Sequence, residues 1–239
     1  MNNNFPIDGL ALYSRQMILD EIGYEGQEKI CNARVLVIGA GGLGCPILTY
    51  LASCGVGTLG IVDFDTVEIH NLHRQILYTK SDIGKQKAII AKEKLNNAYS
   101  HINIISYNEL LNEENAERII SNYNIVVDGS DNFQTRFLVN DFCLKLNKPL
   151  VYGSIFKFEG QISVFNVDGS KHLRDIFPEA PNNEDVPNCN ENGVLGTLPG
   201  TIGNMMALET LKLIIGLPIL SNKLLIINTL TWEFKTLKF

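Results

Sequence analysis

One short stretch constrains the fold of this chain more than any other: an apolar, strand-like run that leads directly into closely spaced glycines. The run Arg34-Val-Leu-Val-Ile is followed by Gly39, Gly41, Gly42 and Gly44 in the pattern G-x-G-x-x-G, and a helix-like segment comes next. Glycine at these positions lets the backbone turn tightly and lets a phosphate approach main-chain N–H groups at the start of a helix. The stretch therefore predicts a nucleotide-binding unit, although alone it does not separate a dinucleotide from ATP.

Strand-like and helical segments alternate through much of the chain. We expect strands at residues 35–39, 59–65, 102–107, 125–129 and 150–154, and helices at about 43–54, 85–98, 113–122 and 132–147. This alternation implies a mostly parallel sheet with right-handed crossovers.

After residue 154 the pattern changes. Residues 160–167 alternate in polarity like an antiparallel strand, and 168–196 form a polar stretch without periodicity. Residues 199–216 are typical of a helix, and 224–235 predict one or two final strands. A structureless run as long as 168–196 is usually functional or mobile.

The sequence thus predicts an α/β fold, with a doubly wound, mostly parallel Rossmann-like sheet, N-terminal helices and a C-terminal antiparallel extension. We expect one domain over residues 1–239. It would comprise an N-terminal helical segment (1–33), a nucleotide-binding core (34–155) and a C-terminal extension (156–239) with a crossover loop at about 168–196.

Composition narrows the compartment and the partners. Of the 239 residues 45% are hydrophobic and 19% charged, as in a globular protein, and the net charge of −6 disfavours nucleic acid as a partner. The five cysteines are scattered without a C-x-x-C pair, which favours reduced thiols in the cytoplasm. No signal-peptide pattern and no apolar run of about 18 residues is present, so we expect no membrane association.

An acidic residue follows the second predicted strand at the distance expected for a nucleotide ribose. Asp63 lies about 20 residues beyond the glycines, where a carboxylate commonly accepts hydrogen bonds from ribose hydroxyls. The alternative is an Asp that only turns the chain at the end of a strand. Asp65 is the less favoured of the two and is expected to shape the turn.

Two cations and an amide follow the same strand. Asn71, Arg74 and Lys87 lie on the next loop and helix start. A hydride-transfer site has no use for them, whereas a triphosphate does, because negative charge grows on its oxygens as pyrophosphate departs. For either cation alone, a solvated basic surface would be the simpler interpretation. Together with Asp63 and the glycines they predict phosphate binding.

A further carboxylate follows the fourth predicted strand. Asp131, in Asp128-Gly-Ser-Asp131-Asn132, could hold Mg²⁺, which prefers one or two carboxylates together with phosphate oxygens and water. The alternative is that Asp131 caps the helix that begins near Asn132.

Taken together, these motifs resemble the ThiF/MoeB/HesA adenylyltransferases, the bacterial relatives of the ubiquitin-activating enzymes. The resemblance extends from about residue 12 to 234 and is carried by motifs in matching order and spacing: Tyr13-Ser-Arg15-Gln16, the glycine loop, Asp63-Phe-Asp65, Asn71-Leu-His-Arg74-Gln75, Lys87 and Asp131-Asn132.

The resemblance implies an activity, a cofactor set and an assembly. The C-terminal glycine carboxylate of a small ubiquitin-fold sulfur carrier would attack the α-phosphate of ATP, giving an acyl-adenylate and pyrophosphate. Arg74, Lys87 and Mg²⁺ at Asp131 would oppose the growing negative charge, and Gln75 and Asn132 would join the nucleotide contacts. A carboxylate is already ionised at neutral pH, so no general base is needed. Arg15 would reach the nucleotide of a second subunit, which makes a homodimer necessary.

Two further features of the family are a cysteine before a Gly-Val pair and a structural zinc site. Cys189 precedes Gly193-Val, where thiamine-type members carry a cysteine that links covalently to the carrier, and we expect either sulfur transfer or an ordinary loop thiol. Many members hold a structural zinc with two C-x-x-C pairs. Here His172 and Asp175 occupy the place of the first pair, so we expect no zinc site.

Three alternatives remain open at this stage. A NAD-dependent oxidoreductase would share the glycine loop and Asp63 but leaves Arg74, Lys87 and Asp131 unexplained. A non-catalytic scaffold of the same fold and a relative that modifies tRNA are the other two. Which carrier is used, of the thiamine type, the molybdopterin type or another with a Gly-Gly tail, stays undetermined.

Overall fold

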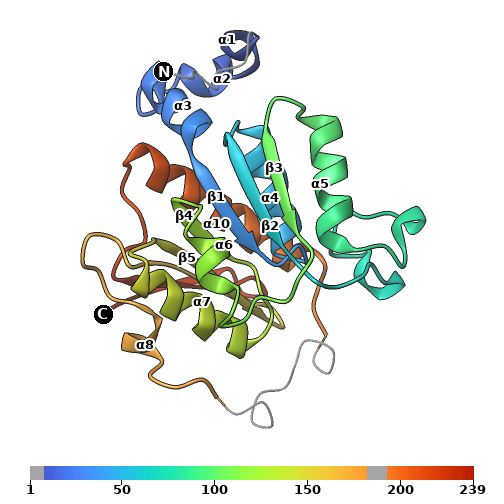
Figure 1. Cartoon of the computed structure of the whole chain (residues 1–239). Coiled ribbons are helices and arrows are strands. Elements are labelled where there is room, and N and C mark those ends of the chain that lie inside the picture. The colour runs from blue at the N-terminus through green and yellow to red at the C-terminus, as the bar shows by residue number, and fades with distance from the viewer. Residues whose placement is uncertain (1–7, 182–192) are drawn as a thin grey trace.

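A mixed sheet lies at the centre of the chain (Figure 1). The computed structural model describes residues 8–181 and 193–239. In these residues the sheet has eight strands: β1 (Arg34–Ile38), β2 (Thr58–Val62), β3 (Asn103–Tyr107), β4 (Ile125–Asp128), β5 (Leu150–Phe156), β6 (Glu159–Phe165), β7 (Lys223–Asn228) and β8 (Glu233–Lys238).

The strand order explains where a ligand can bind. The order is β3-β2-β1-β4-β5-β6-β7-β8, with parallel pairing from β3 to β5 and antiparallel pairing from β5 to β8. The predicted doubly wound sheet with an antiparallel extension is therefore confirmed. Its winding reverses between β1 and β4, and in open α/β sheets ligands bind beyond the carboxyl ends of the strands at such a point.

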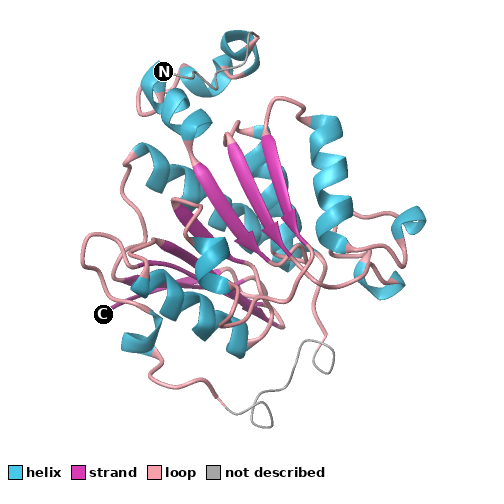
Figure 2. Ribbon diagram, in the orientation of Figure 1, coloured by secondary structure: helices cyan, strands magenta, loops and turns pink. Residues whose placement is uncertain are grey.

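Helices cover both faces of the sheet (Figure 2). Alternate β1 side chains enter different cores. Val35 and Val37 pack with α4 (Gly44–Ser53), α5 (Lys87–Ala98) and α10 (Thr197–Ile215), whereas Leu36 and Ile38 pack with α6 (Ala116–Ile120) and α7 (Phe133–Lys145). Burial on both faces accounts for the continuous apolar run in this strand. The other helices of the described residues are α1 (Gly9–Leu12), α2 (Ser14–Met17), α3 (Gly23–Asn32) and α8 (Leu173–Ile176), with 3₁₀ turns η1 (Ile69–Asn71) and η2 (Lys80–Asp82).

Some element boundaries differ from the expectation. The second strand ends at Val62 rather than at residue 65, because the Asp63 carboxylate turns back to accept backbone N–H groups from the loops. The stretch 168–196, expected to lack structure, contains α8, where the Asp175 carboxylate accepts the His172 backbone N–H at 2.9 Å. None of the helices in the described part of the chain is long and apolar enough to cross a membrane.

Candidate functional site

A cleft opens at the carboxyl edge of the sheet, beside the point where the winding reverses. It encloses about 980 Å³, including the part open to solvent, and the loops after β1, β2 and β4 all contribute to its lining. Nine of the residues predicted from the sequence line it: Gly39, Gly41, Gly42, Asp63, Arg74, Gln75, Lys87, Asp131 and Asn132.

Two predicted nucleotide-binding residues lie behind this lining. Gly44 begins α4, where an added Cβ would come within 2.0 Å of the Gly39 carbonyl oxygen, so glycine is needed there for close packing of helix and strand. Asn71 is buried in η1, and its carbonyl oxygen accepts the backbone N–H groups of Arg74 at 3.1 Å and Gln75 at 3.0 Å. Both residues support the cleft wall.

The remaining two predicted residues lie elsewhere. Arg15 is an exposed residue of α2, and Figure 1 shows α2 beyond the amino ends of the strands, at the opposite end of the sheet from the cleft. Cys189 lies outside the described residues.

Asp63 ties two of the loops together at the floor of the cleft. Its Oδ2 accepts the backbone N–H of Ala40 at 2.7 Å, and its Oδ1 accepts that of Asp65 at 2.8 Å. Burial raises the pKa of the Asp63 carboxyl, and these hydrogen bonds and the nearby Lys87 ammonium oppose the rise. Each carboxylate oxygen keeps capacity for a further hydrogen bond, which suits the predicted ribose contact.

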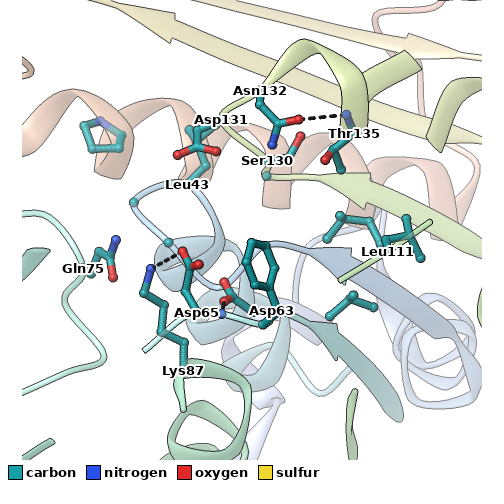
Figure 3. A pocket seen from close by; sticks show the side chains of 18 of the residues that line it. Leu43, Asp63, Asp65, Gln75, Lys87, Leu111, Ser130, Asp131, Asn132 and Thr135 are labelled. Carbon is teal, nitrogen blue, oxygen red and sulfur yellow. Dashed lines mark hydrogen bonds and ion pairs between the residues drawn. The ribbon is translucent and has the colours of Figure 1, made fainter. Parts of the chain in front are cut away.

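Lys87, the first residue of α5, brings a buried ammonium to the same floor. Its Nζ lies 2.9 Å from Asp65 Oδ2, and its side chain is only 6% exposed whereas that of Asp65 is 51% exposed (Figure 3). The pair forms because residue 66 bridges residue 86 and the Lys87 N–H donates to the Asp65 carbonyl at 2.9 Å. Asp65 therefore does more than shape a turn: it holds the lysine in place.

Arg74 and Gln75 form another wall of the cleft. The Arg74 guanidinium donates to the His70 carbonyl at 2.9 Å, which fixes the arginine to its own turn. Gln75 is 4% exposed, and its Oε1 has no hydrogen-bond partner in the residues that the structure describes. A buried amide oxygen without a partner is costly to the fold, so its place in the lining suits a ligand donor.

Asn132, and not Asp131, caps α7, which leaves the Asp131 carboxylate at the cleft. The Asn132 side chain caps α7, with its Oδ1 accepting the Thr135 N–H at 2.8 Å, so the helix-cap alternative for Asp131 is wrong. The Asp131 side chain is exposed at the cleft, across from Lys87 (Figure 3), and forms no hydrogen bond or ion pair with other described residues.

This donor set fits a magnesium nucleotide better than an all-protein metal site. Among the described residues no three His, Cys, Asp or Glu side chains gather closely enough to hold a metal ion. One carboxylate without a partner, that of Asp131, is enough for Mg²⁺ when phosphate oxygens and water complete its coordination.

Comparison with known proteins identifies the family of the chain. The chain matches the ThiF family over residues 13–239. The chain belongs to the ThiF family.

Relatives within the ThiF family carry informative names. The chain is 47% identical over 239 residues to "Adenylyltransferase and sulfurtransferase MOCS3" of Culex quinquefasciatus, covering 100% of this chain and 54% of that protein. It is 46% identical over 234 residues to "Sulfur carrier protein adenylyltransferase" of Thermus thermophilus, covering 95% of this chain and 86% of that protein. The chain spans about half the length of the MOCS3 proteins that it matches.

Solved structures support the fold. A crystal structure of E. coli MccB with ATP superimposes with a TM-score of 0.83 at 21% identity, covering 100% of this chain and 73% of that one. At this identity the likeness concerns the architecture alone.

His172 and Asp175, which stand where the sequence resemblance places a first C-x-x-C pair, lie at the start of α8. Their side chains are close together, with His172 Nε2 3.5 Å from Asp175 Oδ2. Next to them Arg174 forms a two-pronged ion pair with Asp141 of α7, with Nη2 2.6 Å from Oδ2. The Leu173 backbone N–H also donates to Asn140 Oδ1 of α7 at 2.9 Å, and these contacts fasten α8 to α7.

Proposed function

We propose that this chain adenylylates the C-terminal glycine carboxylate of a small ubiquitin-fold sulfur-carrier protein. The carrier carboxylate would attack the α-phosphate of ATP, forming an acyl-adenylate and releasing pyrophosphate. Family membership supports this activity, and so does the name of the Thermus thermophilus relative, of which the match covers 86%. The dinucleotide-dependent and tRNA-modifying alternatives gain no such support.

The observation that carries the proposal is the arrangement of charge around the cleft. Arg74 and Lys87 lie on the same lining as the glycine loop, so a triphosphate seated on the loop's N–H groups would meet both cations. Fixed cations stabilise charge that develops on phosphate oxygens, and they need no reorganisation at the moment of reaction. The rest of catalysis is positioning, because the attacking carboxylate is already ionised.

We assign Lys87 and Asp65 a linked role in this step. The ammonium is buried and already paired at 2.9 Å, so it is oriented before the nucleotide arrives. Incoming phosphate oxygens would share the ammonium with Asp65, since a lysine has three N–H donors.

We propose Asp131 as the ligand of Mg²⁺. Its exposed carboxylate has no partner among the described residues and faces the cleft from the side opposite Lys87. The ion would supply positive charge between the phosphate groups. Asp131 would hold it on the β4 side, away from the cations of the β2 side.

We further propose that the active form is a homodimer. Arg15 lies on α2, at the end of the sheet opposite the cleft (Figure 1), so it can contact a nucleotide only in another copy of the chain. Symmetric pairs are the commonest assembly of soluble proteins, and in such a pair each subunit can lend a residue to the other.

Carrier-dependent exchange of radiolabelled pyrophosphate into ATP tests the proposed function. We expect exchange with a carrier that ends in Gly-Gly and none with the same carrier amidated at its C-terminus, because the amide cannot attack phosphorus as a carboxylate does. Equal exchange with the free and the amidated carrier would contradict the proposal, and so would oxidation of NADH without any exchange.

A further inference from the structure

A buried polar network lies directly beneath Asp131. The Asp128 carboxylate, at the end of β4, accepts two hydrogen bonds at Oδ1: from the Ser130 backbone N–H at 3.0 Å and from the Ser130 hydroxyl at 2.6 Å. Arg136, on α7, donates from Nη2 to the Ser130 carbonyl at 2.9 Å. Ser130 is therefore held from both sides: by Asp128 of the strand at its N–H and hydroxyl, and by Arg136 of the helix at the carbonyl of the peptide that joins it to Asp131.

The arginine in this network is itself held firmly. Its Nη1 donates to the Tyr152 hydroxyl at 3.3 Å, and its Cζ lies 5.4 Å from the Tyr152 ring centre and 5.8 Å from that of Phe133. Arg136 is 6% exposed. A guanidinium between two rings keeps its planar fork in one orientation, which a lysine could not do.

Burial of the Asp128 carboxylate costs more free energy than an apolar residue would at the same turn. Asp128 is 0% exposed, and its Oδ2 has no hydrogen-bond partner among the described residues, so its side chain accepts hydrogen bonds from Ser130 alone within that part of the chain. Burying a charged group destabilises a fold unless its partners compensate, and apolar residues often serve stability equally well. A half-satisfied buried acid next to an available carboxylate indicates a role beyond packing.

Asp131 needs such support because no other contact orients it. Asn132 has taken the cap of α7, and Asp131 forms no hydrogen bond or ion pair of its own with the described residues. A metal-binding side chain on a flexible loop loses conformational freedom when the metal binds, and this loss weakens metal binding.

We propose that Asp128, Ser130 and Arg136 are positioning residues that hold Asp131 ready for the metal of the bound nucleotide. The network acts on Asp131 through the backbone of residue 130, and it sets how strongly the metal strengthens nucleotide binding. This inference rests on the proposed function, because it assumes that Asp131 faces Mg-ATP.

Nucleotide affinity measured with and without Mg²⁺ tests the network without any turnover. In wild-type protein we expect calorimetry to give tighter ATP binding with Mg²⁺ than in EDTA. Ser130→Ala removes the 2.6 Å bond to Asp128, and we expect it to reduce this gain roughly tenfold, as is usual for residues that orient a metal ligand. Affinity in EDTA should stay at the wild-type value, and Ser130→Thr, which keeps a hydroxyl, should restore the gain.

Ser163→Ala is the matched control. Ser163 is also buried, and its hydroxyl donates to the Lys223 carbonyl at 2.8 Å, in the part of the sheet outside the cleft lining. Ser163→Ala should lose stability as Ser130→Ala does, yet Mg²⁺ should increase its affinity for ATP as much as in the wild type. Arg136→Lys gives a second variant that retains charge but loses the fork, and it should also reduce the gain.

Two results would overturn the inference: a full Mg²⁺ gain in Ser130→Ala and Arg136→Lys, or equal losses of affinity with and without Mg²⁺. The second result would mean that the network only shapes the nucleotide pocket. Failure of the proposed function is a different observation, namely wild-type protein that binds Mg-ATP but shows no carrier-dependent exchange.

Discussion

Lys87 is both buried and charged, so its effects on activity and on stability can be measured separately. Its side chain is 6% exposed, and its ammonium pairs with the carboxylate of the half-exposed Asp65. A buried cation stabilises a fold only as far as its partner compensates for lost hydration. The phosphate contact that we propose for Lys87 would explain why the cleft holds this lysine.

Lys87→Met should separate these two effects. We expect exchange activity to fall by about two orders of magnitude or more, because a fixed charge facing the phosphates is lost. The melting temperature should change little. Lys85→Met is the control, since Lys85 lies on the same segment with a side chain 54% exposed and outside the cleft lining. Exchange at the wild-type rate in Lys87→Met would remove the lysine from the mechanism.

The glycine loop offers a matched pair of substitutions at the scale of one element. At Gly44 an added Cβ would meet the Gly39 carbonyl oxygen at 2.0 Å, whereas at Gly41 it would meet only the end of Gln75, at 3.6 Å. Gly44→Ala should therefore destabilise the fold by about 2 kcal/mol or more through overpacking. Gly41→Ala should fold normally and bind ATP more weakly, because its Cβ obstructs phosphate approach. Urea unfolding and ATP titration of both variants check this, and a reversed pattern would contradict the loop's assigned geometry.

A second element, the segment between β2 and α5, is tied to α5 by Asp82. The carboxylate accepts hydrogen bonds from the Thr79 N–H and hydroxyl, each at 2.8 Å, and from the Lys94 ammonium. Burial raises the pKa of Asp82, but the hydrogen bonds from Lys94 and Thr79 outweigh it and lower the pKa to about 2, from 3.8. This anchor holds the segment that carries Arg74 and Gln75.

The lowered pKa predicts acid sensitivity of a definite sign. The ionised Asp82 is favoured in the folded protein, so its stabilisation is full above pH 3.8 and is lost as the pH falls toward 2. A shift of this size corresponds to about 2 kcal/mol. Wild type should exceed Lys94→Met in unfolding free energy at neutral pH, and the difference should narrow as the pH falls below 3.8. A constant difference across this range would contradict the assignment.

Local patterns predicted much of this element structure. The glycines, the alternation of strands and helices and the placement of acids at strand ends follow from local rules, so the cleft and nine of its lining residues could be anticipated. The Asp65–Lys87 pair could not, because it depends on a bridge between residues 66 and 86. The choice between Asp131 and Asn132 as the cap needed geometry, since either side chain can cap a helix. The role of Arg136 could not be predicted from the sequence, because it depends on packing against Tyr152, which follows on the next strand.

At the scale of the whole molecule, Figure 1 shows helices α1 and α2 beyond the amino ends of the strands. The residues that line the cleft follow the carboxyl ends of β1, β2 and β4. The antiparallel strands β6, β7 and β8 continue the sheet of the nucleotide-binding strands, which supports our proposal that the chain is one domain. Because Arg15 lies on α2, at the end of the sheet opposite the cleft, the nucleotide contact that we propose for it would require a second chain.

Mixed dimers test this requirement. Arg15→Ala and Arg74→Ala should each be inactive as homodimers. After the two are unfolded and refolded together, a mixed dimer has one site with both arginines intact, so about a quarter of the wild-type sites should recover. Activity that stays absent in the mixture, or Arg15→Ala homodimers as active as wild type, would contradict the shared site.

The central claim is that one cleft at the carboxyl edge gathers cations and a metal around the triphosphate of ATP. A crystal structure with Mg²⁺ and a non-hydrolysable ATP analogue tests it most directly. We predict phosphates on the glycine loop within hydrogen-bond distance of Arg74 and Lys87, and the metal on Asp131. Phosphates bound elsewhere, or a metal that leaves Asp131 untouched, would contradict the account.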